Sequence, residues 1–351
     1  MTEKKTKILH LLCSNRFSGA ENVVCQIISL FAGNPEVEMV YCSPDGQIRQ
    51  ALSERSITFL PVASMTVKEV KQILRSYRPD IVHAHDMRAS LIAAACCGKT
   101  PLISHIHNNS FNSRGISLKS VAYLWAAKKA KHIFWVSNSA FRGYAFSKCF
   151  AEKSSVLYNI IDTEALYQRM AMDRKTYSYD VVFLGRLTEP KNPKRLMYVL
   201  EKVAQKLPSV KIAIVGTGDL EEETKALCKQ LQLQNAVDFL GFMDNPLKLL
   251  SDSKVMVMTS LWEGTPMCAL EAMALGVPIV STPTDGLCDL IEEGKTGFLS
   301  DDNAVLAEKI VLIVQNESVR KSLSDQSTEV ICSRMNKDVY TAKLLEQYSA
   351  C

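Results

Sequence analysis

The chain has 351 residues, a length at which one hydrophobic core gives way to two, so two domains are expected. Its 41 basic and 37 acidic residues leave a net charge of +4, which is too mild for a nucleic-acid-binding protein. No apolar run reaches the roughly 18 residues of a membrane span. The 11 cysteines are scattered without a C-x-x-C pair, which indicates a reducing, cytoplasmic compartment.

Short apolar runs, typical of buried parallel strands, alternate with amphipathic helical runs through the first half of the chain. This order predicts an α/β domain in which helices cover both faces of a parallel sheet. The strands are expected at 7–13, 37–42, 57–62, 80–86, 101–107 and 132–137, with helices at 21–32 and 67–77 among those between them.

A polar segment at 158–180 interrupts the alternation and is interpreted as irregular. Beyond it, strands are expected at 180–186, 210–216, 236–242, 255–260 and 277–282, with helices at 192–207 and 219–231. The pattern predicts two doubly wound Rossmann-like domains that face each other across a cleft, with ligands at the carboxyl ends of the strands. The predicted boundaries are 1–165 for the first domain, 166–178 for a linker, 179–334 for the second domain, and 335–351 for a helix that crosses back toward the first.

Arg186 and Lys191 follow an apolar strand in the sequence FLGRLTEPKN. A guanidinium fork and an ammonium group at the carboxyl end of a strand suit a diphosphate. Two solvated loop cations are the alternative, although Pro190 and Pro193 stiffen the loop and favour a fixed site.

Two glycine-containing loops follow expected strands. The Gly-Thr-Gly turn at 216–218 is not G-x-G-x-x-G, and the acidic helix start behind it would repel a phosphate. We interpret it as a tight turn beside a base or a sugar, with a purely structural turn as the alternative. In SNRFSGAENVV, Gly19 lets the backbone approach a ligand at a helix start.

Two H-x-H pairs, His83 with His85 and His105 with His107, lie on expected strands, where residues two apart share a face. No nearby Cys or Glu completes a tetrahedral set, so no metal is expected. His107 precedes the polar run 108–111 at the carboxyl end of a strand, and it is the best placed of the four for a substrate.

The segment SLWEGTPMCALEAMALGVP at 260–278 places two glutamates around the start of an apolar helix. Thr265 is expected to cap this helix and Pro266 to begin it, so that the free amides of the first turn form an anion site. Glu263 and Glu271 would then bind hydroxyls on either side of a phosphate, which is the layout of a nucleotide sugar. In the alternative, Glu263 complements the helix N-terminus and Glu271 is a surface residue.

With these motifs the chain resembles the large retaining glycosyltransferase family 4, which has the GT-B fold. The E-x7-E pair of Glu263 and Glu271 resembles the signature of that family. Ser18 and Ile160 stand where the family usually has glycine. The other matching motifs follow in family order over nearly the whole chain: SGAENVV, PLISHIH, LYNIIDTEAL, GRLTEPKN, GTGDLEE, FLGF and GLCDLIEEGKTGFL.

The resemblance implies a role for each candidate residue. Arg186 and Lys191 would hold the donor diphosphate, and Glu271 the ribose hydroxyls. Glu263 would contact the hydroxyls of the donor sugar, and His107 would lie at that sugar near the reacting carbon. Arg186, Lys191, Glu263 and His107 are thus the expected catalytic residues. The other expected donor contacts are Gly19 at the phosphate, Thr217 and Phe242 around the base, and the helix start formed by Gly264, Thr265, Pro266, Met267 and Cys268.

The family expectation is sugar transfer with retention of configuration, in which fixed cations and helix amides stabilise the leaving diphosphate. No Asp-x-Asp motif is present, so neither a cofactor nor a metal is expected. The expected donor is a UDP-hexose or a UDP-N-acetylhexosamine. The expected acceptor is a lipid-linked glycan in the synthesis of a bacterial capsule, exopolysaccharide or lipopolysaccharide.

The segment 117–135 carries four lysines among aromatic residues. Such a segment suits docking on an anionic membrane face, and a core helix with a solvated lysine face is the alternative. The protein is therefore expected in the cytoplasm, with peripheral contact with the inner face of the cell membrane as a further expectation.

Three other functions compete with this interpretation. A nucleotide-sugar epimerase would need acid–base carboxylates in the N-terminal half, and a nicotinamide oxidoreductase would need G-x-G-x-x-G after a strand. A non-catalytic partner subunit that resembles a glycosyltransferase would be expected to lose the donor-binding residues. All four of these are present: Arg186, Lys191, Glu263 and Glu271.

Overall fold

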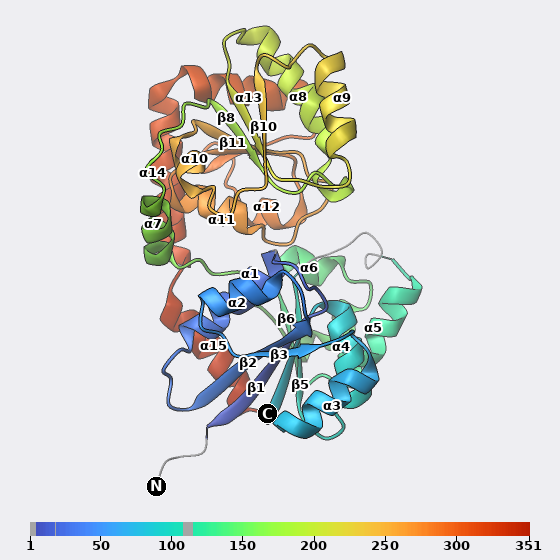
Figure 1. Ribbon diagram of the computed structural model, residues 1–351. Coiled ribbons are helices and arrows are strands. Elements are labelled where there is room, and N and C mark those ends of the chain that lie inside the picture. The colour runs from blue at the N-terminus through green and yellow to red at the C-terminus, as the bar shows by residue number, and fades with distance from the viewer. Residues whose placement is uncertain (1–4, 18, 108–114) are drawn as a thin grey trace. The chain divides into compact units, whose positions relative to one another are not determined.

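The structure is a computed structural model that describes residues 5–17, 19–107 and 115–351 (Figure 1). Ser18 and the polar run 108–111 expected beside His107 lie outside the described residues. The chain divides into two compact units. The N-terminal unit comprises Met1–Ile160 and Asn336–Cys351, and the C-terminal unit comprises Ile161–Met335.

The N-terminal unit is built on a parallel sheet of seven strands, as the alternation of apolar runs predicted. Six of the strands coincide with predicted ones. The short, partly exposed β7 was not predicted, because three residues with two serines carry little apolar signal. Across the sheet the strands are β3 (Phe59–Val62), β2 (Val37–Pro44), β1 (Thr6–Leu11), β4 (Ile81–His85), β5 (Leu102–Ile106), β6 (His132–Trp135) and β7 (Ser154–Val156).

Helices cover both faces of this sheet (Figure 1). On one face, α3 and α5 pack against α4 over a core that contains Trp135 and Tyr123. On the other face lie α1, α2 and the C-terminal helix α15, whose Tyr348 hydroxyl is 2.9 Å from Nδ1 of His83. The helices are α1 (Gly19–Leu30), α2 (Ile48–Glu54), α3 (Val67–Tyr77), α4 (Asp86–Cys96), α5 (Leu118–Lys129), α6 (Asn138–Gly143), the 3-10 helix η2 (Ser147–Lys153) and α15 (Lys337–Ser349).

The C-terminal unit repeats the architecture with a parallel sheet of six strands. Its last strand, β13, was not predicted, since its sequence Gly-Phe-Leu holds only two consecutive apolar residues between polar neighbours. Across the sheet the strands are β10 (Val237–Gly241), β9 (Ile212–Val215), β8 (Val181–Leu184), β11 (Val255–Met258), β12 (Ile279–Ser281) and β13 (Gly297–Leu299).

The helices of the C-terminal unit fall into two groups. The first group packs α8 against α9 and α13, and the second packs α11 against α10 and α14. The helices are α7 (Thr163–Met172), the 3-10 helix η3 (Glu189–Lys191), α8 (Pro193–Lys206), α9 (Glu221–Gln230), α10 (Leu247–Asp252), α11 (Met267–Ala274), α12 (Asp285–Leu290), α13 (Asn303–Gln315) and α14 (Glu317–Arg334).

The interpretation of 158–180 as irregular was wrong in part, because α7 occupies much of this segment. The side chain of Asp162 caps this helix by accepting the amide of Ala165 at 3.1 Å. Leu166 is buried, and the hydroxyl of Tyr167 donates to the carbonyl of Ala274 at 2.8 Å. One cap and a few well-placed contacts thus stabilise a helix whose sequence shows only a weak amphipathic pattern.

The strand order places a reversal of direction in each sheet. In the C-terminal unit the chain winds outward from β8 to β10 and then returns to β11 beside β8. In the N-terminal unit the same reversal separates β1 from β4. Loops diverge at such a switch point and leave room for a ligand at the carboxyl ends of the two strands. The candidate residues accordingly fall into two groups, one in each unit.

Candidate active site

A buried ion pair occupies the switch point of the C-terminal unit. Lys191 ends η3 in the loop after β8, and Glu263 lies in the loop after β11. The ammonium group of Lys191 donates to Oε1 of Glu263, and the hydroxyl of Ser260 donates to the same oxygen at 2.6 Å. The sequence predicted both charged residues at the site but not their pairing. Ser260, which sequence reasoning missed, stands three residues before Glu263.

Burial shapes the electrostatics of this pair. The side chains of Lys191 and Glu263 are only 17% and 11% exposed. Burial by itself disfavours the charge on Lys191, but the adjacent carboxylate outweighs it, and the net effect is a raised pKa for Lys191. Arg186 is exposed, and its positive charge acts in the opposite direction on Lys191. Lys191 is therefore a fixed cation beside the Glu263 carboxylate, and Arg186 is a solvent-facing cation that acts on it.

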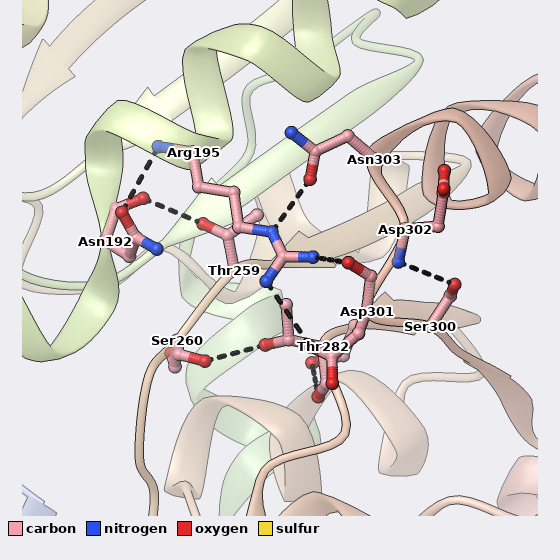
Figure 2. Close-up of polar contacts among 10 residues, drawn as sticks. Asn192, Arg195, Thr259, Ser260, Thr282, Ser300, Asp301, Asp302 and Asn303 are labelled. Carbon is pink, nitrogen blue, oxygen red and sulfur yellow. Dashed lines mark hydrogen bonds and ion pairs between the residues drawn. The ribbon is translucent and has the colours of Figure 1, made fainter.

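A polar network connects the loops that carry the pair, and Figure 2 shows part of it. The hydroxyl of Thr259 donates to the carbonyls of Lys191 and Asn192, each at 3.2 Å. The hydroxyl of Thr282 donates to the carbonyl of Ser260 at 2.7 Å. Asn192 has φ +49°, in the left-handed region, and its side chain caps α8. These contacts hold the backbone on both sides of the ion pair.

Arg195 extends the same network to the end of β13 (Figure 2). Its Nε donates to Oδ1 of Asn303 at 2.8 Å, and its guanidinium also contacts the carbonyl and the carboxylate of Asp301. The first turn of α8 is thereby tied to the loop before α13. The sequence alone gives no signal for this link, since Arg195 and its partners are more than 100 residues apart.

Helix α11 begins one residue later than predicted. Its first residue is Met267, and Pro266 is the cap residue, in an extended conformation without a side-chain cap hydrogen bond. The prediction that Thr265 caps the helix and Pro266 begins it was therefore wrong. Gly264, Thr265 and Pro266 are buried, and the first-turn amides still lie at the helix end beside Glu263.

Glu271 lies in the second turn of α11 and is not an ordinary surface residue. Burial raises the pKa of its carboxyl to about 7, and Arg169 of α7 partly offsets this. Burial likewise raises the pKa of the nearby Cys268 thiol to about 12. A carboxyl group that is half ionised near neutral pH responds strongly to any ligand that donates hydrogen bonds to it.

Three glycines of this unit are required by close packing between loops. A Cβ on Gly216 would lie 2.1 Å from the carbonyl oxygen of Gly185, and one on Gly218 would lie 2.2 Å from that of Leu187. A Cβ on Gly286, at the start of α12, would lie 1.1 Å from the carbonyl oxygen of Gly264. The structure thus supplies a packing reason for the Gly-Thr-Gly turn that the sequence left open.

Thr217 and Phe242 lie on neighbouring loops rather than at the ion pair. Both are exposed, and Phe242 is 70% exposed. The carbonyl of Thr217 accepts the amide of Leu187 at 3.0 Å, and the amide of Gly216 donates to the carbonyl of Gly241 at 2.7 Å. The two predicted base-binding residues are therefore on adjacent loops at the same edge of the sheet.

In the N-terminal unit, His107 is held in place from two sides. Its backbone amide donates to Oδ1 of Asp86 at 3.0 Å, and its Nε2 is 2.8 Å from Nδ1 of His85. Asp86 itself has φ +68°, a strained value for a residue with a side chain. Gly19, the first residue of α1, is exposed and has open space where a Cβ would lie.

The two H-x-H pairs belong to a larger buried histidine cluster. The register pairs His10 with His83 and His85 with His105. Burial lowers the pKa of His10 and His107 to about 3 and shifts the pKa of His83, His85 and His105 in the same direction, so these imidazoles are neutral at pH 7. The expectation of no metal rested on the lack of a nearby Cys or Glu as a further ligand for either pair. Neighbouring strands supply a histidine instead, since the ring nitrogens of two triads lie within 4.8 Å of one another: His10 with His83 and His85, and His85 with His105 and His107.

Comparison with known proteins identifies the class of protein to which this fold and these loops belong. The model of the family described as Glycosyltransferase Family 4 matches residues 17–165, and that described as Glycosyl transferases group 1 matches residues 169–330. The chain therefore belongs to the glycosyltransferases of the GT-B type, in which a family 4 domain precedes a group 1 domain. It is an enzyme of the transferase class.

Individual relatives agree with this assignment. An uncharacterized glycosyltransferase of Methanocaldococcus jannaschii is 27% identical over 73% of this chain and 76% of its own length. The UDP-Gal:alpha-D-GlcNAc-diphosphoundecaprenol alpha-1,3-galactosyltransferase of Escherichia coli is 24% identical over 87% and 86%. The crystal structure of Anabaena HepE with UDP and glucose has a TM-score of 0.87 at 22% identity, covering 99% of this chain and all of that one. This structural likeness establishes the fold.

None of the helices in the described parts of the chain combines the length and the apolar character that crossing a membrane requires.

Proposed function

We propose that this chain is a retaining, metal-independent enzyme that transfers a hexose or N-acetylhexosamine from a UDP-sugar to a lipid-linked glycan of a bacterial surface polysaccharide. The observation that carries the proposal is the buried Lys191–Glu263 pair at the switch point, beside the start of α11. A cation, a carboxylate and helix amides together suit the phosphate and the hydroxyls of a nucleotide sugar. The names of the Escherichia coli relative and the Anabaena structure support UDP as the nucleotide.

The proposed chemistry follows from the charges. As the bond between the sugar and the diphosphate breaks, positive charge develops on the sugar ring and negative charge on the leaving phosphate. Lys191 and Arg186, with the first-turn amides of α11, would stabilise the leaving diphosphate. Glu263 would accept hydrogen bonds from the sugar hydroxyls, and His107 would contact the same sugar. The fixed cation makes a metal unnecessary for this step. Gly19, Thr217 and Phe242 would complete the contacts to the phosphate and the base.

Glu271 gives the donor site a testable pH dependence. Ribose hydroxyls donate hydrogen bonds, so the ionised carboxylate is the form that binds. Since the carboxyl has a pKa of about 7, donor binding is expected to weaken as the pH falls through 7. If only the ionised form binds, the Kd for a UDP-sugar rises about tenfold between pH 8 and pH 6.

Isothermal titration with UDP-glucose and UDP-N-acetylglucosamine, in EDTA and in magnesium, measures this dependence. UDP-sugars are the right probes because a free terminal phosphate itself titrates near pH 6. Glu271→Gln is expected to bind more weakly at pH 8 and to lose the pH dependence, whereas Glu308→Gln, on the exposed face of α13, keeps it. A wild-type Kd that does not change with pH would contradict the proposed contact between Glu271 and the ribose. No binding of any UDP-sugar would overturn the proposed donor, and an affinity that needs magnesium would overturn the metal-independent mechanism.

The proposed lipid-linked acceptor requires access to a membrane, and α5 offers a suitable face. Leu118, Val121 and Trp125 are spaced along one side of the helix and are 92%, 46% and 44% exposed. The ammonium group of Lys129 lies 4.4 Å from the ring centroid of Trp125. Residues 87–151 contain nine Lys or Arg and no Asp or Glu. Apolar side chains beside cations are the combination that binds anionic lipid surfaces.

Co-sedimentation with vesicles tests this face. The wild type is expected to bind vesicles of phosphatidylcholine with phosphatidylglycerol, and to release from them at high salt, because about 1 kcal/mol of attraction per lysine near the surface is screened. Leu118→Ser with Trp125→Ser is expected to lower the bound fraction at least tenfold. Met172→Ser, which alters a similarly exposed apolar residue on α7, serves as the matched control. Equal binding by all three proteins would contradict an α5 contact.

A further inference from the structure

All six histidines of the chain lie in the N-terminal unit, on four neighbouring strands or at their ends. Five of them, His10, His83, His85, His105 and His107, stack on the sheet face that also meets Tyr348 of α15. Their ring centroids approach as closely as 4.2 Å, between His105 and His107. Five neutral rings stacked on one face are more than packing requires, and buried polar groups of this kind are normally hydrogen-bonded.

Three of these rings form a hydrogen-bonded chain. Nδ1 of His10 is 3.0 Å from Nε2 of His85, and Nδ1 of His85 is 2.8 Å from Nε2 of His107. Both ring nitrogens of His85 are therefore used. The two ends of the chain, Nε2 of His10 and Nδ1 of His107, are buried and have no hydrogen-bond partner among the described residues. Of these two terminal rings, His107 is the one that directly follows β5.

The tautomers of the three rings must agree. A neutral imidazole has one N–H donor and one bare nitrogen acceptor. If Nδ1 of His10 carries the proton, it donates to His85, which must then carry its own proton on Nδ1 and donate to His107. His107 in turn must carry its proton on Nδ1. The reverse arrangement places all three protons on Nε2, and a mixed arrangement breaks one hydrogen bond.

Each arrangement leaves one buried donor without a partner among the described residues, and the two differ in which ring carries that donor. With protons on Nε2, the end of the chain at His10 is a buried N–H without an acceptor among the described residues, in a ring that is 0% exposed. With protons on Nδ1, that end is a bare nitrogen instead. Orphaned buried donors are the rarer of the two in proteins. With protons on Nδ1, the donor without a partner is Nδ1–H of His107, which is also buried but belongs to a ring that is 7% exposed and follows β5, where an incoming ligand can accept it.

A metal ion is the competing explanation of the same cluster. The triads of ring nitrogens are close enough to share one. Three neutral ligands, however, would leave a doubly charged ion in a fully buried site, and burying an uncompensated charge is costly. Both nitrogens of His85 are already at hydrogen-bond distance from other rings. The hydrogen-bonded chain accounts for the geometry without that cost.

We propose that His85 and His10 are positioning residues that lock His107 in the Nδ1–H tautomer, so that His107 presents a hydrogen-bond donor to an oxygen of the donor sugar. The part of this proposal that concerns the sugar rests on the proposed function, whereas the tautomer lock does not. Because each ring polarises the next, the chain also strengthens the donor at its open end. Asp86 completes the arrangement by fixing the backbone of His107.

Nitrogen-15 NMR of ring-labelled histidines tests the lock in the full chain without any substrate. At pH 7 the rings of His10, His85 and His107 are expected to be neutral with the proton on Nδ1. His10→Phe is expected to release His85 and His107 into a mixture of tautomers. His10→Asn, whose amide nitrogen can donate from the position of Nδ1, is expected to restore the lock. Protons on Nε2 in the wild type would overturn the proposal, as would stoichiometric zinc retained through purification.

The same variants test the effect on catalysis. His85→Phe is compared with His105→Phe, which makes the same change at an equally buried ring that stacks on His107 but loses no hydrogen bond among the described residues. With both variants folded, His85→Phe is expected to lower kcat at least tenfold with little change in KM for the donor, and His105→Phe to stay within twofold. Equal effects of the two variants on kcat would mean that the hydrogen-bonded histidines contribute only packing, and would overturn the positioning role. A wild type without transferase activity would instead count against the proposed function, while the NMR result would still decide the lock.

Discussion

At pH 5 the N-terminal unit is expected to unfold while the C-terminal unit remains folded. The reason is the distribution of titratable groups, since every histidine is in the N-terminal unit. Burial lowers the pKa of His10 and His107 from 6.5 to about 3 and that of His132 to about 4. A lowered folded-state pKa of a base means that the stability is present above pH 6.5 and is lost as the pH falls below it.

The expected size of the loss is comparable with the stability of a domain. At pH 5 the solution lies 1.5 units below the unfolded-state value of 6.5, so each of these three histidines costs about 2 kcal/mol, or about 6 kcal/mol together. His83, His85 and His105 add to the loss in the same direction. Whole domains are stable by only about 5–15 kcal/mol.

The C-terminal unit responds to acid with the opposite sign. Its Glu271 has a folded-state pKa of about 7, above the unfolded-state value of 4.5. A raised pKa of an acid means that protonation favours the folded state, so acidification from pH 7 to pH 5 stabilises this unit by about 2–3 kcal/mol. Acid therefore separates the stabilities of the two units.

Pulsed hydrogen exchange, resolved by mass spectrometry of peptides, distinguishes the two units in the intact chain. Between pH 7 and pH 4, peptides from β1, β4 and β5 are expected to lose protection before those from β8, β9 and β11. His105→Phe removes one buried titratable ring and is expected to move the first transition to lower pH. Simultaneous loss of protection in both units, or earlier loss in the C-terminal unit, would contradict the assignment.

Lys191→Met is expected to lower both stability and activity, and the two effects can be separated. Removing one partner of a buried ion pair leaves the other charge without compensation, which costs about 3–5 kcal/mol. The proposed role at the leaving diphosphate predicts that kcat falls by about 10² to 10³, the usual effect of losing one electrostatic contact to a transition state.

A double variant separates the effect on stability from the effect on activity. In Lys191→Met with Glu263→Gln, the uncompensated carboxylate is gone, so most of the lost stability is expected to return while activity stays low. Lys206→Met breaks a pair with Glu308 whose side chains are 46% and 61% exposed, and it is expected to change the free energy of unfolding by less than about 1 kcal/mol. Urea denaturation and an assay of sugar transfer measure the two quantities. Full activity in Lys191→Met would exclude the proposed role of this lysine.

The sequence predicts the two sheets well because buried parallel strands leave continuous apolar runs. It fails at β7 and β13, whose sequences Ser-Ser-Val and Gly-Phe-Leu leave no apolar run, and at α7, which depends on the cap from Asp162. Local patterns therefore suffice for the large elements. They do not suffice where a single contact or an edge position decides the structure.

The candidate site shows the same limit at the level of side chains. Lys191 and Glu263 stand out individually, but 72 residues separate them, and their pairing becomes visible only when β8 and β11 are neighbours. His10 carries no motif at all. It lies near His85 and His107 because the strand register aligns His10 with His83 and His85 with His105. The spacing of residues along the sequence cannot reveal this alignment.

Gly286 has a consequence for engineering the loop 260–266, which the proposed function places beside the donor sugar. The carbonyl of Gly264 occupies the space that a side chain at position 286 would need. The start of α12 and the turn beside Glu263 are therefore in direct contact. A library that randomises 260–266 alone would explore only shapes that fit against that glycine. Useful variation in the loop therefore calls for changes on α12 in the same library, with position 286 held constant.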